Sequence, residues 1–406
     1  SSDVCSSDLA ATSPLSSVYT LSVSATGADS GLDDVATGQN ILLYMDGSSV
    51  VGRVGNPSGS IAFRVSVDGD GTVTLDQQRA IKHPTTDPDE GISLSSADLV
   101  RLSRTDTITD RDGDVTSDTL TLNIAKAFSF EDDGPVITKT QAAPADALLV
   151  DETNLGIDAT AEFADNFAAG FGYNYGADGP AAAGALTSAY VLNVLSSGAD
   201  SGLDDVATGQ NILLYMDGNA VVGRVGTSTG DIAFRVSVDG DGTVTLDQQR
   251  AIKHPTTNPD EGLSLSSPEL IQLSRTDTIT DRDGDSTSGT LTLNIGSALT
   301  FNDDGPVITK TQATAADALL VDETNLAANA NAEFADNFDA GFSYNYGADG
   351  QAATSPLSSV YTLSVSATGA DSGLDDVATG QNILLYMDGN AVVGRVGNPS
   401  GSIAFR

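Results

Sequence analysis

The stretch IAFRVSVDGDGTVTLDQ, residues 232–248, decides the fold class of the chain. Its first half places Ile232, Phe234, Val236 and Val238 on one side of an extended backbone, with Arg and Ser facing the other side. An apolar–polar alternation with a period of two is typical of a strand that buries one face. The turn-rich VDGDG then leads into TVTLDQ, and two such runs joined by Gly and Asp predict a β-hairpin.

Neighbouring stretches repeat this signal. NILLYMDGNAVVGRVG (211–226) predicts another hairpin, with its turn at Asp217-Gly218-Asn219, and TLTLNI (290–295) alternates Leu and Ile with Thr and Asn. Ser267-Pro268-Glu269-Leu270 predicts one helical turn, since Ser can cap and Pro suits the first helical position. With roughly eight to ten short strands in each repeat, the sequence predicts an all-β fold of tandem β-sandwich domains, immunoglobulin-like or cadherin-like.

The chain repeats itself with a period of 171 residues. SGLDDVATGQNILLYMDG begins at Ser30, Ser201 and Ser372, and DDGPVITKTQA begins at Asp132 and Asp303. Such a period indicates tandem domains, and Gly-Pro, which interrupts strands and helices, suits the boundary between them. We therefore expect a partial repeat over 10–134, a complete repeat over 135–305 and a partial repeat over 306–406.

Residues 1–9, SSDVCSSDL, resemble the translation of a sequencing adapter and are set aside from the fold. They hold Cys5, the single cysteine, so we expect no disulfide and no cysteine-based zinc site in the repeats. An extracellular protein without disulfides needs other cross-links, and metal ions are the obvious candidates.

The charge balance restricts the classes of partner. The 406 residues include 56 acidic and 18 basic ones, which gives a formal net charge of −38. Such a field repels nucleic acids and anionic membranes and attracts divalent cations, so nucleic-acid binding is excluded. No apolar run approaches the roughly 20 residues that span a bilayer, so we expect no membrane insertion of this segment.

The acidic motif TDRDGD recurs once per repeat and is the first candidate metal site. Its aspartates are Asp110, Asp112 and Asp114 in one copy and Asp281, Asp283 and Asp285 in the next. Oxygen ligands at alternate positions suit Ca²⁺, and the glycine lets the backbone curl around an ion. An EF-hand is excluded, because its sixth and twelfth positions hold Val115 and Thr121. A different kind of calcium loop and a solvated acidic turn remain the alternatives.

The second candidate is the acidic motif at each predicted domain boundary. It reads Glu131, Asp132 and Asp133 in one copy and Asn302, Asp303 and Asp304 in the other. The change from Glu to Asn keeps a side-chain oxygen, which a ligand tolerates and a plain turn tolerates equally. We expect either a calcium ion at this junction, bridging adjacent domains, or a simple Gly-Pro turn that separates them.

The remaining polar motifs favour structural roles. The aspartates of the DGDG motif are explained by a hairpin turn; they are Asp68, Asp70, Asp239 and Asp241. We expect the aspartates of the SGLDD motif to be loop carboxylates, with a bound ion as the alternative; they are Asp33, Asp34, Asp204 and Asp205. Tyr173 and Tyr175 alternate as on a strand, which favours packing over a sugar-binding platform.

Catalysis has little support in the sequence, and we predict that the segment is not an enzyme. His83 and His254 are repeat equivalents, so each repeat holds one histidine, which we expect to be structural. A Ser-His-Asp arrangement would depend on that one residue. Paired carboxylates for glycoside hydrolysis are present, but no Trp is available to stack a sugar.

Several motifs in a fixed order resemble a known repeat class. VDETNL, DSGLDDVATGQNILLY, VDGDGTVTLDQQRAIKHP, TDTITDRDGD and F-x-DDGP resemble the large tandem repeats of bacterial repeats-in-toxin (RTX) adhesins, relatives of the VCBS repeats. The resemblance implies type I secretion, a secreted or cell-surface location and calcium-dependent folding outside the cell. It implies an extender or adhesive stalk, in which the partners are neighbouring repeats, with surface glycans or other cells as further candidates.

Calcium would give this class its mechanism. If ion binding supplies folding free energy, the chain stays loose in a low-calcium cytosol and folds on meeting calcium outside. The alternative function is a repeated calcium-dependent carbohydrate-binding module that uses Tyr173 and Tyr175.

Overall fold

The computed structural model describes residues 15–406, so the adapter-like residues 1–9, with Cys5, lie outside the described residues. The chain divides into two compact units between Asp349 and Gly350, and each unit is described by itself. Below, the first repeat means residues 15–134, the second repeat 135–305 and the third repeat 306–406. These domain boundaries remain predictions.

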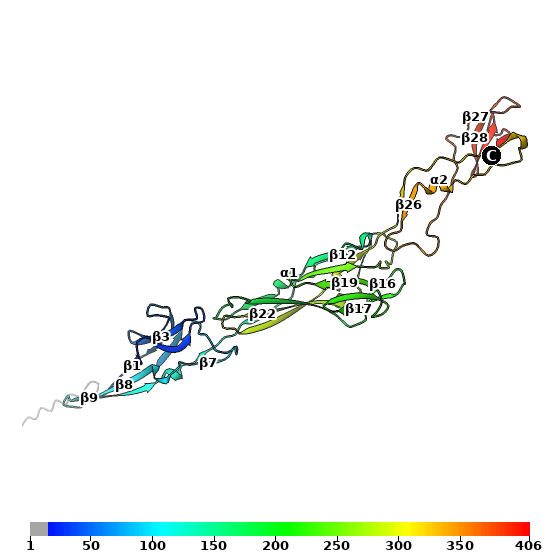
Figure 1. The fold of residues 1–406 in the computed structure, drawn as a ribbon. Helices are drawn as coiled ribbons and strands as arrows, with labels where there is room; N and C mark the ends of the chain where they lie inside the picture. Colours follow the sequence, from blue (N-terminus) through cyan, green and yellow to red (C-terminus); the bar gives the residue numbers. More distant parts are fainter. Residues whose placement is uncertain (1–14) are drawn as a thin grey trace, which may run out of the picture. The chain divides into compact units, whose positions relative to one another are not determined.

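The first repeat holds a five-stranded antiparallel sheet and a three-stranded one (Figure 1). The larger sheet, in the order β2-β3-β4-β5-β6, consists of β2 (Ala28–Asp33), β3 (Asn40–Asp46), β4 (Ser49–Val54), β5 (Ile61–Val67) and β6 (Val73–Gln77). The smaller, β1-β8-β9, consists of β1 (Leu15–Val23), β8 (Val100–Thr109) and β9 (Val115–Asn123). The other elements are β7 (Gly91–Ile92), which pairs with β10 (Phe130–Glu131), and the 3₁₀ turns η1 (Ala97–Leu99) and η2 (Ala125–Ala127).

The second repeat extends the same plan. Its large sheet, in the order β13-β20-β19-β18-β17-β16, consists of β13 (Ala159–Glu162), β16 (Ala199–Asp204), β17 (Asn211–Asp217), β18 (Ala220–Val225), β19 (Ile232–Val238) and β20 (Thr243–Gln248). The facing sheet, β15-β22-β23, consists of β15 (Leu186–Val194), β22 (Ile271–Thr280) and β23 (Ser286–Asn294). Because β15 packs against β17, β18 and β19, the two sheets form a sandwich.

Shorter elements close the second repeat. They are β11 (Val136–Lys139), β12 (Leu148–Asp151), β14 (Phe171–Asn174), β21 (Gly262–Ser264), β24 (Leu299–Asn302), α1 (Ala164–Ala168), η3 (Glu152–Asn154), η4 (Pro268–Leu270) and η5 (Gly296–Ala298). The strand β12 pairs in parallel with β24, and β11 pairs with β14. The parallel pair joins the beginning of the repeat to its end.

The third repeat is shared between the two units. In the first unit, β25 (Val307–Lys310) pairs with β26 (Phe342–Asn345), and the helical elements are η6 (Glu323–Asn325) and α2 (Ala335–Asp339). The second unit is one four-stranded antiparallel sheet of β27 (Ala370–Asp375), β28 (Asn382–Asp388), β29 (Ala391–Val396) and β30 (Ile403–Phe405).

The predicted hairpins are confirmed. Strands β17 and β18 pair up to Asp217 and Ala220, and the two-residue turn between them begins at Gly218, whose φ of +63° suits a type II′ turn. Strands β19 and β20 form the hairpin of 232–248. The expected buried face of β19 is correct except for a bulge in its pairing with β18, which also buries Ala233.

Two separate apolar cores support the sandwiches. The core of the first repeat includes Phe63 and Phe130, and the core of the second includes Phe234 and Phe301, whose ring centroids lie 5.0 Å apart in both repeats. Gly223 in β18 lets the Phe234 ring approach, because an added Cβ would lie only 2.3 Å from that ring.

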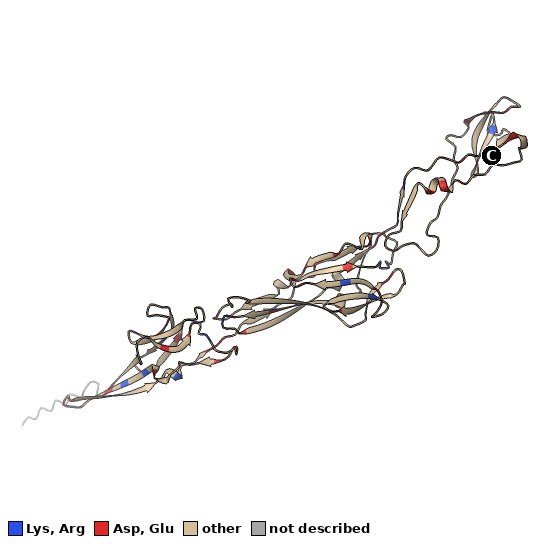
Figure 2. Cartoon of the chain, viewed as in Figure 1, with Lys and Arg blue, Asp and Glu red and all other residues tan. Residues whose placement is uncertain are grey.

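The predicted helical turn is present as η4, but its expected cap is not. Ser267 makes no side-chain capping bond, and its hydroxyl donates instead to Glu269 Oε2 at 2.5 Å. No helix among residues 15–406 is long and apolar enough to cross a membrane. Acidic residues occur throughout the described chain (Figure 2).

Candidate metal centre

The two TDRDGD loops have the same local backbone geometry. In the loop between β22 and β23, Asp281 Oδ1 accepts hydrogen bonds from the backbone N–H groups of Gly284 (3.1 Å) and Asp285 (2.8 Å). In the first repeat, Asp110 Oδ1 accepts the equivalent bonds at the same two distances. Gly284 adopts a φ of +118°, which explains the glycine. The local sequence is therefore sufficient to shape the loop.

The surroundings of the two loops differ. Asp281 and Asp285 are 0% and 1% exposed, whereas all three aspartates of the first-repeat loop are exposed. Residues of the first repeat cover the second-repeat loop, because the backbone N–H of His83 donates to Asp283 Oδ2 at 3.2 Å. Burial of the loop is thus a property of the contact between consecutive repeats.

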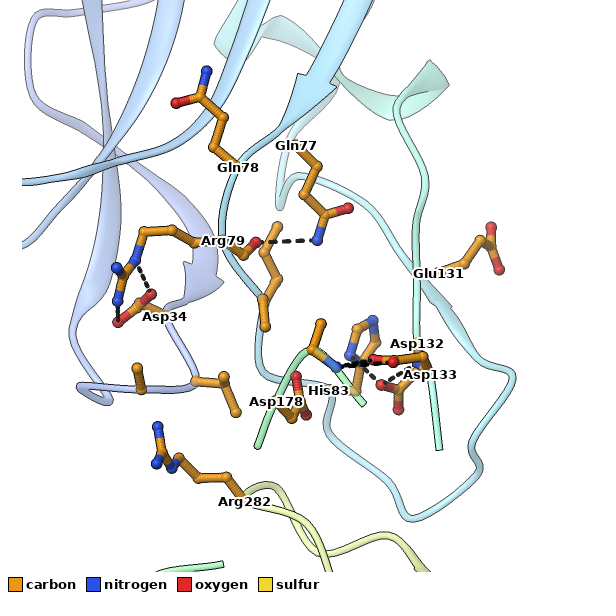
Figure 3. Close-up of a pocket in the computed structure, with 15 residues that line it drawn as sticks. Asp34, Gln77, Gln78, Arg79, His83, Glu131, Asp132, Asp133, Asp178 and Arg282 are labelled. Atoms are coloured by element: carbon orange, nitrogen blue, oxygen red, sulfur yellow. Dashed lines mark hydrogen bonds and ion pairs between the residues drawn. The ribbon is translucent and has the colours of Figure 1, made fainter. Parts of the chain in front are cut away.

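Six ionisable side chains meet at this contact, and we call them the junction cluster. They are His83 and Asp132 from the first repeat and Asp178, Asp281, Asp283 and Asp285 from the second. One triad joins His83, Asp132 and Asp283, and another joins Asp178, Asp281 and Asp283. Within each triad, the potential ligand atoms lie within 4.8 Å of one another. Figure 3 shows His83, Asp132 and Asp178 gathered at one side of a pocket.

The junction cluster leaves many buried oxygens without a hydrogen-bond donor. Within this cluster, the buried carboxylate oxygens without a hydrogen-bond partner among the described residues are Asp132 Oδ2, Asp178 Oδ2, Asp281 Oδ2, Asp283 Oδ1, Asp285 Oδ1 and Asp285 Oδ2. Burying a carboxylate without a donor or a countercharge is costly. This set of oxygens therefore fits a cation that would lie among them.

Burial and mutual repulsion raise the pKa values of these carboxyl groups. Burial raises the pKa of Asp178 to about 8 and that of Asp281 to about 7, with Asp283 beside each adding to the shift. Burial also raises the pKa of Asp132 to about 6, although His83 opposes the shift. The pKa of Asp285 is raised by burial and by the charge of Asp283. Without a cation, the folded cluster therefore resists full ionisation.

The SGLDD carboxylates provide a contrast within the same chain. Asp34 is buried, and Arg79 pairs with both of its oxygens at 2.7 and 3.0 Å. Burial pushes the pKa of Asp34 upward, but the hydrogen bonds from Arg79 and Thr37 outweigh it and hold the pKa below its usual value. Asp205 is paired with Arg250 in the same way. At Asp34 and Asp205, an arginine guanidinium therefore supplies the positive charge that a bound ion would otherwise supply.

The junction cluster has no such guanidinium. Among the ion pairs of residues 15–406, only His83 joins it, with Nδ1 at 3.2 Å from Asp132 Oδ1 and 3.9 Å from Asp283 Oδ2. Arg282 lines the neighbouring pocket without an ion pair to these carboxylates (Figure 3). Asp34, Asp205 and Asp277 are thus each buried beside an arginine, whereas the five aspartates of the junction cluster have none among residues 15–406.

A second cluster contains the equivalents of the first-repeat residues. Glu152, His254 and Asp303 bring their potential ligand atoms within 4.8 Å of one another, and Glu152 Oε2 and Asp303 Oδ1 lack hydrogen-bond partners among the described residues. Burial raises the pKa of Glu152 to about 7, against the hydrogen bonds from Ile252 and Gln248. His254 and Asp303 correspond to His83 and Asp132 of the preceding repeat.

Four other candidates of the boundary motif lie outside these clusters. Glu131 is exposed and accepts from the Ser129 hydroxyl at 2.5 Å, and Asn302 lies in β24. Asp133 and Asp304 instead accept backbone hydrogen bonds from Ala177 and Ala348, respectively. Of the first loop, Asp110, Asp112 and Asp114 approach one another but stay exposed.

Three kinds of residue in these clusters were not predicted from the sequence as candidate metal ligands. His83 and His254 were assigned a structural role, and Asp178 and Glu152 were not singled out. The signal for Asp178 was present in the repeated YNYGADG, which places Asp349 one period later. Burial raises the pKa of Asp349, with the charges of Asp303 and Asp304 adding to the shift.

Tyr173 is packed rather than displayed as a sugar platform. Its hydroxyl donates to Asp277 Oδ2 at 2.5 Å, and its ring stacks on Phe171 with centroids 6.1 Å apart. Asp277 is fully buried and also accepts from Arg275 Nε at 2.8 Å. The Tyr173 hydroxyl is therefore already hydrogen-bonded within the protein and is not free to bind a sugar.

Comparison with solved structures finds only weak likeness. The protocadherin gammaB7 EC3-6 cis-dimer matches at 14% identity and a TM-score of 0.19, over 72% of this chain and 53% of that one. The protocadherin gammaB4 extracellular domain matches at 11% and 0.19, over 72% and 35%. A tetra-tandem repeat in the extending region of a large adhesion protein matches at 17% and 0.08, over 69% and 74%. At these TM-scores, the likenesses carry no argument.

No curated protein matches the chain. The family described as Domain of unknown function (DUF5801) matches residues 2–123, 147–296 and 318–406. The chain therefore belongs to this family and carries its domain three times in tandem.

Proposed function

We propose that this chain is a calcium-stiffened extender segment of a secreted or cell-surface bacterial adhesin, of the kind whose large repeats are exported by type I secretion. The observation that carries the proposal is the junction cluster, in which five aspartates from two consecutive repeats are buried with six oxygens that lack hydrogen-bond donors. The tandem family domain and the order of motifs resembling RTX adhesin repeats support the same function.

Calcium suits the donor set better than other common hard cations. Ca²⁺ accepts about six to eight oxygens in a flexible geometry, whereas Mg²⁺ demands a near-ideal octahedron and keeps several waters. Asp178, Asp281 and Asp283 would hold the ion, with Asp132 and Asp285 supplying further oxygens or charge. The ion would neutralise carboxylates that otherwise repel one another across the contact.

The location of the site gives calcium a mechanical role. Asp132 belongs to one repeat and the other four aspartates to the next, so a bound ion would link the two and resist their separation. If the ion binds only the folded junction, its binding free energy adds to the stability of the fold. In millimolar calcium the array would be stiff, and in a low-calcium cytosol it would stay loose enough for export.

We assign the segment no catalytic role and no sugar site. The two clusters that contain a histidine, and the triad of Asp178, Asp281 and Asp283 beside one of them, lie at the boundaries between repeats, and only the triad of Asp110, Asp112 and Asp114 is an exposed loop among the described clusters. The carbohydrate-binding alternative depended on a tyrosine platform, and the Tyr173 hydroxyl is bound to Asp277. Adhesion to cells or glycans would then belong to other parts of the full protein.

The test is a comparison of the chain in calcium and in chelator. At a calcium concentration about 100 times the Kd, the expected stabilisation is about 2.7 kcal/mol, which for repeats of this size corresponds to a rise in Tm of roughly 5–10 °C. Small-angle scattering should show a stiffer particle in calcium. Magnesium at the same concentration is the control and should do much less. Unchanged melting and scattering after chelation would contradict the proposal.

A further inference from the structure

We infer that the histidine side of the junction cluster is a second cation site, which takes a divalent transition metal through His83 Nδ1, Asp132 and Asp283. It lies beside the proposed calcium site and shares Asp283 with it, because that residue belongs to both triads. The inference uses the same junction as the proposed function, but it does not depend on calcium being the occupant of the all-oxygen triad.

The first step is the tautomer of His83. Its Nε2 lies 3.1 Å from the backbone carbonyl oxygen of Phe130, and both groups are buried. A carbonyl oxygen only accepts hydrogen bonds, so Nε2 carries the proton. In the neutral ring, Nδ1 is then the bare nitrogen with its lone pair. Metal-binding histidines have this arrangement, since they commonly donate the other N–H to a carbonyl or carboxylate.

The second step is what faces Nδ1. The nearest charged atoms are Asp132 Oδ1 at 3.2 Å and Asp283 Oδ2 at 3.9 Å, and Nδ1 has no hydrogen-bond partner among the described residues. The His83 side chain is 2% exposed. A buried lone pair that faces two carboxylates requires a positive charge between them. That charge is either a proton on Nδ1 or a metal ion.

The remaining oxygens favour the metal. A proton on Nδ1 would serve the oxygens that face it, yet Asp132 Oδ2 and Asp283 Oδ1 are also buried without partners. An ion bound at roughly 2.1 Å from nitrogen and oxygen ligands holds tetrahedral ligand pairs about 3.4 Å apart. The separation of 3.2 Å between His83 Nδ1 and Asp132 Oδ1 is close to this spacing, and the 3.9 Å between His83 Nδ1 and Asp283 Oδ2 would have to shorten by about 0.5 Å on binding.

The two triads differ in the ion that they prefer. Imidazole nitrogen suits zinc, copper, iron and nickel, whereas calcium is bound through oxygen. Asp178, Asp281 and Asp283 offer oxygen alone, while His83 adds nitrogen on the other side of Asp283. His254, one period later, also lies among carboxylates, but in a different arrangement: both of its ring nitrogens lack hydrogen-bond partners among the described residues, and Nε2 rather than Nδ1 faces Glu152 Oε1, at 3.7 Å.

The experiment uses cobalt(II) as the spectroscopic probe, added to the full chain in saturating calcium so that all-oxygen sites are filled. The Cys5→Ser background removes the thiol, which would otherwise bind the probe. Equilibrium dialysis counts the bound cobalt, and visible absorption and X-ray absorption at cobalt identify its ligands. His83→Gln should lose one equivalent of cobalt and keep its calcium, and His254→Gln should keep the cobalt at His83.

Each outcome decides the inference. No cobalt uptake in calcium, uptake without imidazole in the X-ray absorption of the unaltered His83 site, or equal uptake by a folded His83→Gln chain would overturn it. The X-ray absorption result stands even if His83→Gln fails to fold. Cobalt binding without any calcium binding would contradict the proposed function and leave this inference intact.

Discussion

The stretch TITDRDGD occurs at residues 107–114 and again at 278–285, with the same sequence and the same hydrogen bonds within the loop. The first copy is exposed, and the second is buried among His83, Asp132 and Asp178. The motif therefore shapes the loop, but the contact with a preceding repeat makes it a candidate metal centre.

A second pair of identical sequences also adopts two different structures. LSSVYTLSV forms strand β1 at residues 15–23, where it pairs along its whole length with β8. The same letters at 357–365 form no strand. The first copy pairs with β8, which lies much later in the chain, whereas the hairpin β28–β29 needs only adjacent residues and is present. Strand propensity alone therefore does not make this stretch a strand.

The strand pair gives the largest expected effect. Leu21→Ala should cost about 2–5 kcal/mol of stability, because Leu21 is 6% exposed within the first core. The identical substitution Leu363→Ala should change stability by less than about 0.5 kcal/mol, since Leu363 is 64% exposed. Urea unfolding of both variants measures the difference. Equal losses would show that the two copies share one environment.

The next effect concerns a carboxylate whose cation is built in. Arg250→Gln should cost about 3 kcal/mol, because it leaves the buried Asp205 carboxylate without its guanidinium. The loss should be the same in calcium and in chelator, since Asp205 does not belong to the junction cluster. Chemical denaturation in calcium and in chelator measures the loss of stability. A loss seen only in calcium would contradict the distinction between the arginine-paired aspartates and the junction cluster.

Matched substitutions in the two loops sharpen the comparison directly. Asp283→Asn should weaken calcium binding by about 100-fold or more, because loss of even an outer-shell partner costs about 10- to 100-fold, and it should therefore remove most of the roughly 2.7 kcal/mol of calcium-induced stabilisation. In chelator the same change should raise stability, because it removes a repelling charge. Asp112→Asn in the exposed loop should do neither. Melting curves with and without calcium distinguish the outcomes, and similar behaviour of the two variants would contradict the role of burial.

The last prediction concerns the pH dependence of the calcium-free protein. Carboxyl groups with raised folded-state pKa values bind protons more tightly when folded, so they favour the fold at low pH and lose that contribution as pH rises. The pKa of an aspartate in the unfolded chain is the ordinary 3.8, whereas in the folded chain it is about 6 for Asp132 and about 8 for Asp178. The contribution of these groups should therefore fall between about pH 4 and pH 8. Denaturant titrations of metal-stripped protein measure it, and Asp283→Asn should flatten the slope.

The sequence was sufficient for elements made by neighbouring residues. The hairpins at 211–226 and 232–248 follow from alternation and turn residues, and both are present. The bulge at Ala233 had no local signal, because it depends on how β18 and β19 are aligned. The pairing of β12 with β24 also depends on segments separated by most of a repeat.

The candidate site could be predicted only in pieces. Asp132, Asp281, Asp283 and Asp285 were named from two separate motifs, and the structure brings these two motifs together. His83 and Asp283 lie 200 positions apart, and their contact comes from the packing of consecutive repeats. No motif spans that distance, so the contact of His83 with Asp283 could not be read from the sequence, and the repeated YNYGADG marked Asp178 without placing it beside the other aspartates. That these residues bind metal remains a prediction.

Diffraction from crystals of the calcium-bound chain tests the central claim most directly, because the anomalous signal of calcium locates the ion without reference to any variant. Our account predicts a strong anomalous peak among Asp178, Asp281 and Asp283, within coordination distance of oxygens from the second repeat and beside Asp132 of the first. A peak confined to the exposed loop of Asp110 and Asp114, or no peak at the junction, would contradict it.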